Sequence, residues 1–287
     1  MCLPVKPSKD NWWTTEHQPG GKFGNSTEPY SEMGGVIASY STGPVAIGDG
    51  IGFTDVELVL RSCTAKTGTL LQPSRPATAI DACFFEAAFG SSRSEDGGSV
   101  ESSAGGANSA MNVGPVPNKP KNYPVWSTHT AIAVSDNSGT SMMSWAHVFA
   151  IQLKSPFPVF PRHLPVDIDV GRLPLMIQWT GWGPISNVTL GGLFTHSSPI
   201  KLPACAAHDF QLHHAAPVFP FGTQRGIALL GEPAKWVPVA PRRIASVNVR
   251  AVAPISSSSL DVVVTGNDII KNLGKYQSCM VSKLPWL

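Results

Sequence analysis

The sequence predicts a mainly β protein, in which a small α/β part precedes an antiparallel β-sandwich. Gly and Pro number 27 and 26, and charged residues make up only 14% of the 287 residues. This balance suits short strands joined by turns better than long charged helices. Apparent strands and helices alternate within residues 1–89, whereas from about Tyr123 on the pattern offers strands and turns almost exclusively. That change marks a domain boundary.

The α/β part begins with a predicted strand, helix and strand. Residues 11–15 (NWWTT) are rich in strand-favouring side chains and precede a glycine-rich loop. A helix is predicted over 28–40, capped by Asn25, Ser26 or Thr27. Its apolar residues recur with helical spacing, at Met33, Val36, Ile37 and Tyr40. Residues 45–47 then form a short apolar strand that ends in the loop 48–52, which completes a βαβ pattern.

A second helix is predicted to open at Thr54. Thr54 and Glu57 have the spacing of a capping box, and Val56, Leu60 and Cys63 would lie along one face of the helix. Residues 70–71 and 79–85 are predicted strands that lead into the next domain.

Residues 90–122 hold Gly, Ser, Asn and Pro in quantity and no aromatic residue. Such a segment cannot bury enough apolar area to offset its ordering entropy, so we expect a disordered insertion. An incorrectly joined gene model is the alternative, because structureless loops of this length are unusual inside compact domains. The chain therefore divides into an α/β part (1–89), the insertion (90–122) and a sandwich (123–287).

The sandwich is predicted from short apolar and β-branched runs separated by Pro, Gly and Ser, without helical periodicity between them. These runs cover residues 125–134, 144–153, 173–179, 188–194, 226–230, 236–239, 244–252 and 260–264.

Several segments of the α/β part follow one another in a recognisable order: DNWW at 10–13, the helix at 28–40, STGPVAIGD at 41–49 and DVEL at 55–58. This order resembles the end of the catalytic barrel in the raffinose-synthase and α-galactosidase group of glycoside hydrolases. LLQPSRPAT at 70–78 and DACFF at 81–85 look like that group's passage to its C-terminal domain. VWST at 125–128 and GEPAKWVPV at 231–239 look like strands of its C-terminal sandwich.

The resemblance implies a partial (β/α) barrel followed by an antiparallel β-sandwich. About 200 residues or more are needed to close such a barrel, so residues 1–89 supply only its end. The two catalytic Asp residues that the resemblance implies follow earlier strands, and no motif in this sequence matches theirs. We therefore assign no catalytic residue and expect a truncated, glycoside-hydrolase-like protein related to enzymes acting on α-galactosides, without activity by itself. A missing barrel portion or a partner chain would cover the partial barrel.

A non-catalytic carbohydrate-binding or interaction module is the alternative function. In that case the sandwich would fold alone and use exposed tryptophans.

Asp10 and Asp49 are the carboxylates at predicted strand ends, where barrel enzymes place their sites. Either could accept hydrogen bonds from sugar hydroxyls, and either could instead bond its own backbone in a turn, which is the commoner role of Asp in such loops. Trp12 or Trp13 could stack on a sugar. Because they alternate across a strand, we expect at least one in the core. The core is also favoured over an exposed aromatic face for Trp179, Trp182 and Trp236.

Other kinds of site are disfavoured. His208, Asp209, His213 and His214 match no standard metal spacing, so no metal and no cofactor are expected. Neither a nucleophile elbow nor a dinucleotide-binding fingerprint is present. The net charge of +2 includes no basic run, which argues against nucleic acid as a partner.

The compartment stays open. No apolar stretch is long enough to span a membrane, and the start of the chain lacks a signal-peptide core, so a soluble protein is expected. The cysteines have no CxxC pair and are expected to be free thiols. Asn25 and Asn187 lie in sequons that would permit glycosylation in a secreted precursor.

Overall fold

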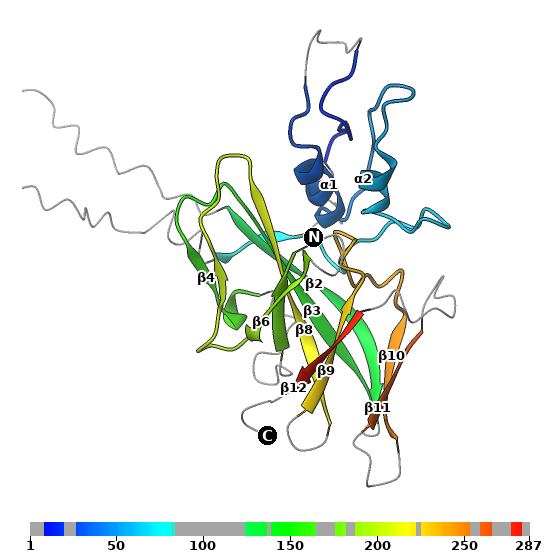
Figure 1. Cartoon of the computed structure of the whole chain (residues 1–287), viewed down its shortest axis with the longest axis vertical. Helices are drawn as coiled ribbons and strands as arrows, with labels where there is room; N and C mark the ends of the chain where they lie inside the picture. Colours follow the sequence, from blue (N-terminus) through cyan, green and yellow to red (C-terminus); the bar gives the residue numbers. More distant parts are fainter. Residues whose placement is uncertain are drawn as a thin grey trace, which may run out of the picture.

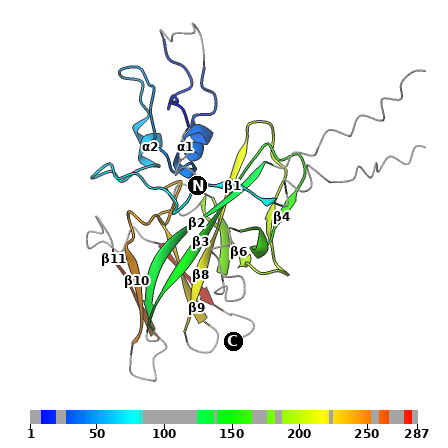
Figure 2. The same cartoon turned by 180° about the vertical axis from the view of Figure 1, so that it is seen from behind.

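The computed structural model describes residues 9–19, 27–81, 83, 124–136, 139–164, 176–181, 187–221, 225–252, 259–265 and 277–282. The predicted insertion at 90–122 lies outside these residues. The described part is mainly β with antiparallel sheets, as predicted. The helices gather at one end of the sheets (Figures 1 and 2).

The α/β part contains helices α1 (Ser31–Tyr40) and α2 (Val56–Leu60). Ahead of α1, Trp12 forms a parallel bridge with Ile47, which follows α1. The Trp12 amide donates to the Ala46 carbonyl (3.4 Å) and the Gly48 amide donates to the Trp12 carbonyl (2.9 Å). A parallel pair needs a crossover connection, and α1 lies in that connection. The predicted helix is present, but the predicted strands over 11–15 and 45–47 are reduced to this single bridge between Trp12 and Ile47.

Helix α1 starts later than predicted. It begins at Ser31, with Tyr30 as an N-cap that makes no side-chain hydrogen bond, so the predicted cap Thr27 is not at the N-cap position. The other predicted caps, Asn25 and Ser26, lie outside the described residues. Its predicted apolar face is nevertheless the buried one. Val36 and Tyr40 are buried, and Met33 and Ile37 pack against the same cluster.

Helix α2 is capped by Asp55 instead of Thr54. The Asp55 carboxylate accepts a hydrogen bond from the Leu58 amide (3.0 Å), which satisfies one of the free amides of the first turn. The helix is so short that only Leu58 is fully buried, while Val56, predicted on the buried face, is 61% exposed. The predicted capping box was therefore wrong by one residue. The predicted buried face of the helix was wrong as well.

The largest sheet has the strand order β11-β10-β2-β3-β8-β5-β6. β1 pairs with β2, β9 pairs with both β8 and β12, and β4 and β7 form a separate two-stranded sheet. The strands are β1 (Thr78–Ala79), β2 (Val125–Asp136), β3 (Gly139–Ile151), β4 (Phe157–Val159), β5 (Met176–Thr180), β6 (Thr189–Leu193), β7 (Ile200–Leu202), β8 (Phe210–Phe221), β9 (Arg225–Gly231), β10 (Ser246–Val252), β11 (Ser259–Thr265) and β12 (Gln277–Ser282).

Within the described residues, β10 and β2 form a parallel pair and every other strand pair is antiparallel. The strictly antiparallel arrangement expected from the sequence is wrong at this one pair. The chain reaches β10 only after the long excursion through β3 to β9, so no tight hairpin fixes its direction relative to β2.

Strand β8 was not predicted, although it is central. Its first half pairs with β3 and β5, whereas residues from Val218 on pair with β9. Pro217 lies at the changeover, where it is the last residue paired with β5. Proline cannot donate to a ladder, so it fits the point where a strand leaves one neighbour for another.

The predicted strand over 236–239 is wrong. Residues 233–239 form turns and bends between β9 and β10. Gly231 before them has a φ of 81°, and Pro233 and Pro238 provide no backbone donors for a ladder. We call residues 232–240 the clamp segment, because it makes hydrogen bonds to both α1 and the end of α2.

The clamp segment contacts the helices through backbone and side-chain hydrogen bonds. Lys235 donates to the carbonyls of Leu60 (2.6 Å) and Cys63 (2.9 Å), which caps the end of α2. The Trp236 carbonyl accepts from the Tyr40 hydroxyl (3.1 Å). The Trp236 side chain is fully buried in a cluster that also contains Trp12 and Leu58. The α/β part and the sheet therefore share one apolar core.

Among the described residues, neither α1 nor α2 has the length and apolar character that crossing a membrane requires.

Candidate functional site

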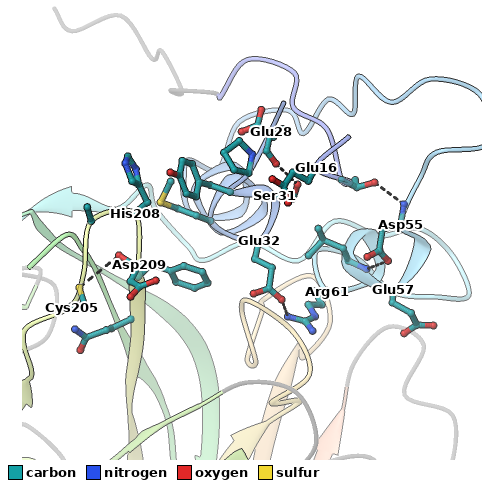
Figure 3. Close-up of a pocket in the computed structure, with 18 of the residues that line it drawn as sticks. Glu16, Glu28, Ser31, Glu32, Asp55, Glu57, Arg61, Cys205, His208 and Asp209 are labelled. Atoms are coloured by element: carbon teal, nitrogen blue, oxygen red, sulfur yellow. Dashed lines mark hydrogen bonds and ion pairs between the residues drawn. The ribbon is translucent and has the colours of Figure 1, made fainter. Parts of the chain in front are cut away.

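A cleft of about 800 Å³ lies where the helices meet the turn before β8. Its lining comes from residues that follow the first strand, from the first turn of α1 and the segment before it, from α2, and from residues 203–211 (Figure 3). Crevices next to strand ends and helix N-termini are common ligand sites in α/β folds.

The helical side of the cleft is fixed by an ion pair between the two helices. The Arg61 guanidinium donates to the Glu32 carboxylate at 2.8 Å, and Figure 3 shows the pair spanning the space between α1 and α2. Arg61 also lies over the Trp236 ring, 4.9 Å from its centroid, so the clamp segment orients the guanidinium.

The opposite side is the turn at 203–209. His208 has a φ of 71°, an uncommon conformation for a residue with a side chain. Its ring stacks on Tyr30 at 4.3 Å between centroids, which joins the turn to the residue before α1. The Cys205 amide donates to the Leu153 carbonyl (2.9 Å), so the turn is tied to the end of β3. The two sides are thus held by contacts independent of any ligand.

The cleft is acidic. Its carboxylates are Glu16, Glu28, Glu32, Asp55, Glu57 and Asp209. Among the described lining residues, Arg61 carries the one permanent positive charge, and Glu32 already pairs with it. The carboxylates of Glu28 and Asp209 make no side-chain hydrogen bond or ion pair within the described residues. They remain open as acceptors toward a ligand.

Asp49 lies two residues after Ile47, which bridges to Trp12, and its carboxylate bonds to the protein itself. One carboxylate oxygen accepts from the Thr14 amide (2.7 Å) and the Gln18 side chain (2.6 Å), and the other accepts from the Thr14 hydroxyl. The Thr14 hydroxyl in turn accepts from the Asp55 amide (2.7 Å). Asp49 therefore joins the two loops that follow the bridged residues Trp12 and Ile47. Its predicted contact with sugar stays a prediction.

Asp10 is exposed and accepts a hydrogen bond from the Asn11 amide (2.8 Å), a local turn contact. It does not line the cleft. Trp12 is buried at 2% exposure, so at least one tryptophan of the pair lies in the core as expected, and Trp13 is half-buried. Trp179 and Trp236 are buried too, as the sequence favoured.

The histidines considered for metal binding separate in the structure. His208 lies on the cleft turn, whereas His213 and His214 point to opposite faces of β8. His214 Nδ1 lies 2.8 Å from His147 Nδ1, and the other His147 nitrogen contacts the Thr130 hydroxyl at 3.0 Å. Burial lowers the pKa of His147 to about 3 and that of His214 well below its usual value. Within the described residues no group of three His, Cys, Asp or Glu side chains could hold a metal.

Sequence reasoning did not predict the cleft. Glu28 and Tyr30 were assigned to a helix, and no motif links them to residues 203–211, which lie far away in the chain. No protein-family model matches this chain, and no curated protein matches it.

Proposed function

We propose that this chain is a non-hydrolytic relative of glycoside hydrolases and that it binds a carbohydrate in the cleft. The observation that carries this proposal is the cleft itself, which combines free carboxylate acceptors with the aromatic side chains of Tyr30 and Phe210. Sugars present hydroxyl donors around apolar ring faces, so acceptors beside aromatic rings complement them.

The proposed ancestry implies the end of a (β/α) barrel followed by a sandwich. The parallel bridge between Trp12 and Ile47, with α1 in the connection, supports the barrel part. Apolar side chains around the second strand end stay uncovered: Ile47 is 39%, Ile51 103%, Phe53 38% and Val56 61% exposed. An uncovered apolar surface supports the idea that a missing barrel portion or a partner chain packs there.

The absence of hydrolysis follows from the proposed lineage together with the role of Asp49. A glycosidase needs a pair of carboxyl groups at a set separation on either side of the bond. Asp49, one of the predicted strand-end carboxylates, is occupied by Thr14 and Gln18. We therefore expect no turnover of aryl α-galactosides.

Calorimetric titration with raffinose and galactose tests the binding proposal. We expect saturable binding that weakens at least tenfold in Glu28→Gln, because this change removes a charged acceptor from the cleft. Asp10→Asn is the matched control, since Asp10 lies outside the cleft, and its affinity should equal that of the unmodified chain. Loss of binding in Asp10→Asn with retention in Glu28→Gln would move the site to the strand end. Robust aryl α-galactoside turnover that disappears in Asp49→Asn would overturn the inactivity.

A further inference from the structure

A second pocket, of about 340 Å³, lies on the β part, away from the cleft. It is lined by Gln178, Trp179, Thr180, Thr189, Gly191, Ser198, Pro199, Lys201 and His213. None of these residues lines the cleft. The volume falls at the lower end of the range of small-molecule sites.

The floor of this pocket is one face of three neighbouring strands. Thr180 of β5 pairs with Thr189 of β6 on one side and with His213 of β8 on the other, so these three side chains share a face. Gln178 shares the face because it lies two residues from Thr180. Trp179 alternates to the other side, where its ring stacks on His214 at 4.2 Å.

The same face is apolar further along the strands and polar at the pocket. Met176 and Ala215 belong to a buried cluster with Ile200 and Leu202 of β7. On the same face of β5, Met176 is followed by the polar residues Gln178 and Thr180. Ile200 and Leu202 of β7 pack against the apolar part of this face. Lys201, which lies between these two buried residues, is exposed and lines the pocket.

Several polar groups of the pocket lack protein partners. Within the described residues, the side chains of Gln178, Thr189, Ser198 and Lys201 make no hydrogen bond or ion pair. The Thr180 hydroxyl, by contrast, donates to the Leu212 carbonyl (2.6 Å). A polar ligand in the pocket can therefore hydrogen-bond to side chains that do not already serve the protein.

The charge of the pocket selects the ligand. Lys201 carries its positive charge, and none of the described lining residues has a carboxylate. Burial lowers the pKa of His213 to about 4, so at neutral pH its imidazole is uncharged and Lys201 is the one positive charge among the described lining residues. The His213 Nε2 atom lies 3.4 Å from the Gln211 amide oxygen, which leaves Nδ1 as its second hydrogen-bonding atom. This is the opposite of the acidic cleft.

We propose that this pocket binds a small hydroxylated anion, whose oxyanion group contacts the Lys201 ammonium and whose hydroxyl groups contact the polar floor. Lysine binds phosphate and carboxylate groups as a point charge. The hydroxyl and amide groups of Thr189, Ser198 and Gln178 both donate and accept, which matches ligand hydroxyl groups.

Calorimetric titration of the full chain with glucose 6-phosphate, glucose and inorganic phosphate tests this site. We expect saturable binding of glucose 6-phosphate, and at least tenfold weaker binding of glucose and of inorganic phosphate alone. Lys201→Met should weaken glucose 6-phosphate at least tenfold, whereas Lys201→Arg should retain affinity within a few-fold. Lys66→Met is the matched control, because Lys66 is exposed and lies outside both pockets.

Equal binding by Lys201→Met and the unmodified chain would overturn the proposal, as would the absence of saturable binding at millimolar concentration. Inorganic phosphate binding as tightly as glucose 6-phosphate would overturn the role of the floor. Glu28→Gln, which weakens the cleft, should leave glucose 6-phosphate binding unchanged, so the two sites are tested separately.

Discussion

Individual polar residues in this protein act mainly on its own structure. Asp49 and Thr14 illustrate this, since the Asp49 carboxylate accepts hydrogen bonds from Thr14 and so holds two loops together. The buried pair of His147 and His214 is a second case. One ring nitrogen must donate and the other accept across their 2.8 Å contact, so the accepting ring is neutral. Burial also lowers the pKa of both histidines, which disfavours the charged form of either ring.

These histidines predict how stability depends on pH. Burial lowers the pKa of His147 from 6.5 to about 3. Between pH 6.5 and pH 3, His147 is therefore protonated in the unfolded chain and neutral in the folded chain. Stability should therefore be greatest above pH 6.5 and fall as the pH drops toward 3, with His147 contributing a slope of about 1 kcal/mol per pH unit in this window.

Urea unfolding between pH 7 and pH 4 measures this slope. His147→Gln should make it shallower, because one proton-binding difference is removed. His17→Gln is the control, since the His17 side chain is 75% exposed. A slope in His147→Gln as steep as that of His17→Gln would contradict the assignment.

At the scale of elements, the spacing of apolar residues predicted the buried face of α1 and the positions of most strands. It failed at segments that contain proline. The apolar positions of α1 and most strands follow from spacing alone. Strand β8 was not predicted because Pro217 and Pro220 are not expected in a central strand. Its change of partner from β5 to β9 also depends on tertiary packing, which local sequence does not contain. The strand predicted at 236–239 failed for the opposite reason. Its apolar side chains are buried, but the backbone that carries them forms turns and bends instead of a strand.

The candidate site shows the same limit. Local sequence predicted that Asp49 follows a short strand, and the structure has a single bridge at Ile47 instead. A cleft built from residues near 30 and near 208 requires knowing how the two parts pack. No local pattern contains that packing.

Gly231, the last residue of β9 and the one before the clamp segment, provides a prediction for this segment. It has a φ of 81°, and an added Cβ would clash with the Pro238 carbonyl oxygen. Gly52 has a similar φ of 85° with open space around it. Gly52→Ala should cost about 1 to 2 kcal/mol from backbone strain alone. Gly231→Ala should cost several kcal/mol more, since the clash adds to the strain. Equal losses in urea unfolding would show that the clamp segment adapts.

At the scale of the whole molecule, one core cluster joins the helices to the sheet. It contains Trp12, Tyr40 and Leu58 from the α/β part, and Phe149, Leu212 and Trp236 from the β part. A shared core makes its two sides unfold together.

Trp236→Ala tests this coupling. Removing a fully buried Trp should cost about 3 to 5 kcal/mol, because it leaves a cavity between the two parts. Hydrogen exchange should then rise together in peptides from α1 and from β3. Leu190→Ala is the control, since Leu190 is 45% exposed and should change exchange little. Faster exchange confined to α1 would show that the parts unfold independently.

The clamp segment also has a consequence for synthesis of the protein on the ribosome. The apolar faces of α1 and α2 emerge early, yet Trp236, which covers them, and Lys235, which caps α2, are translated much later. Contacts between residues so distant in sequence form slowly, and exposed apolar faces invite aggregation in the meantime. The nascent α/β part should therefore need chaperone protection until residue 240 has left the exit tunnel, after which the helices can dock.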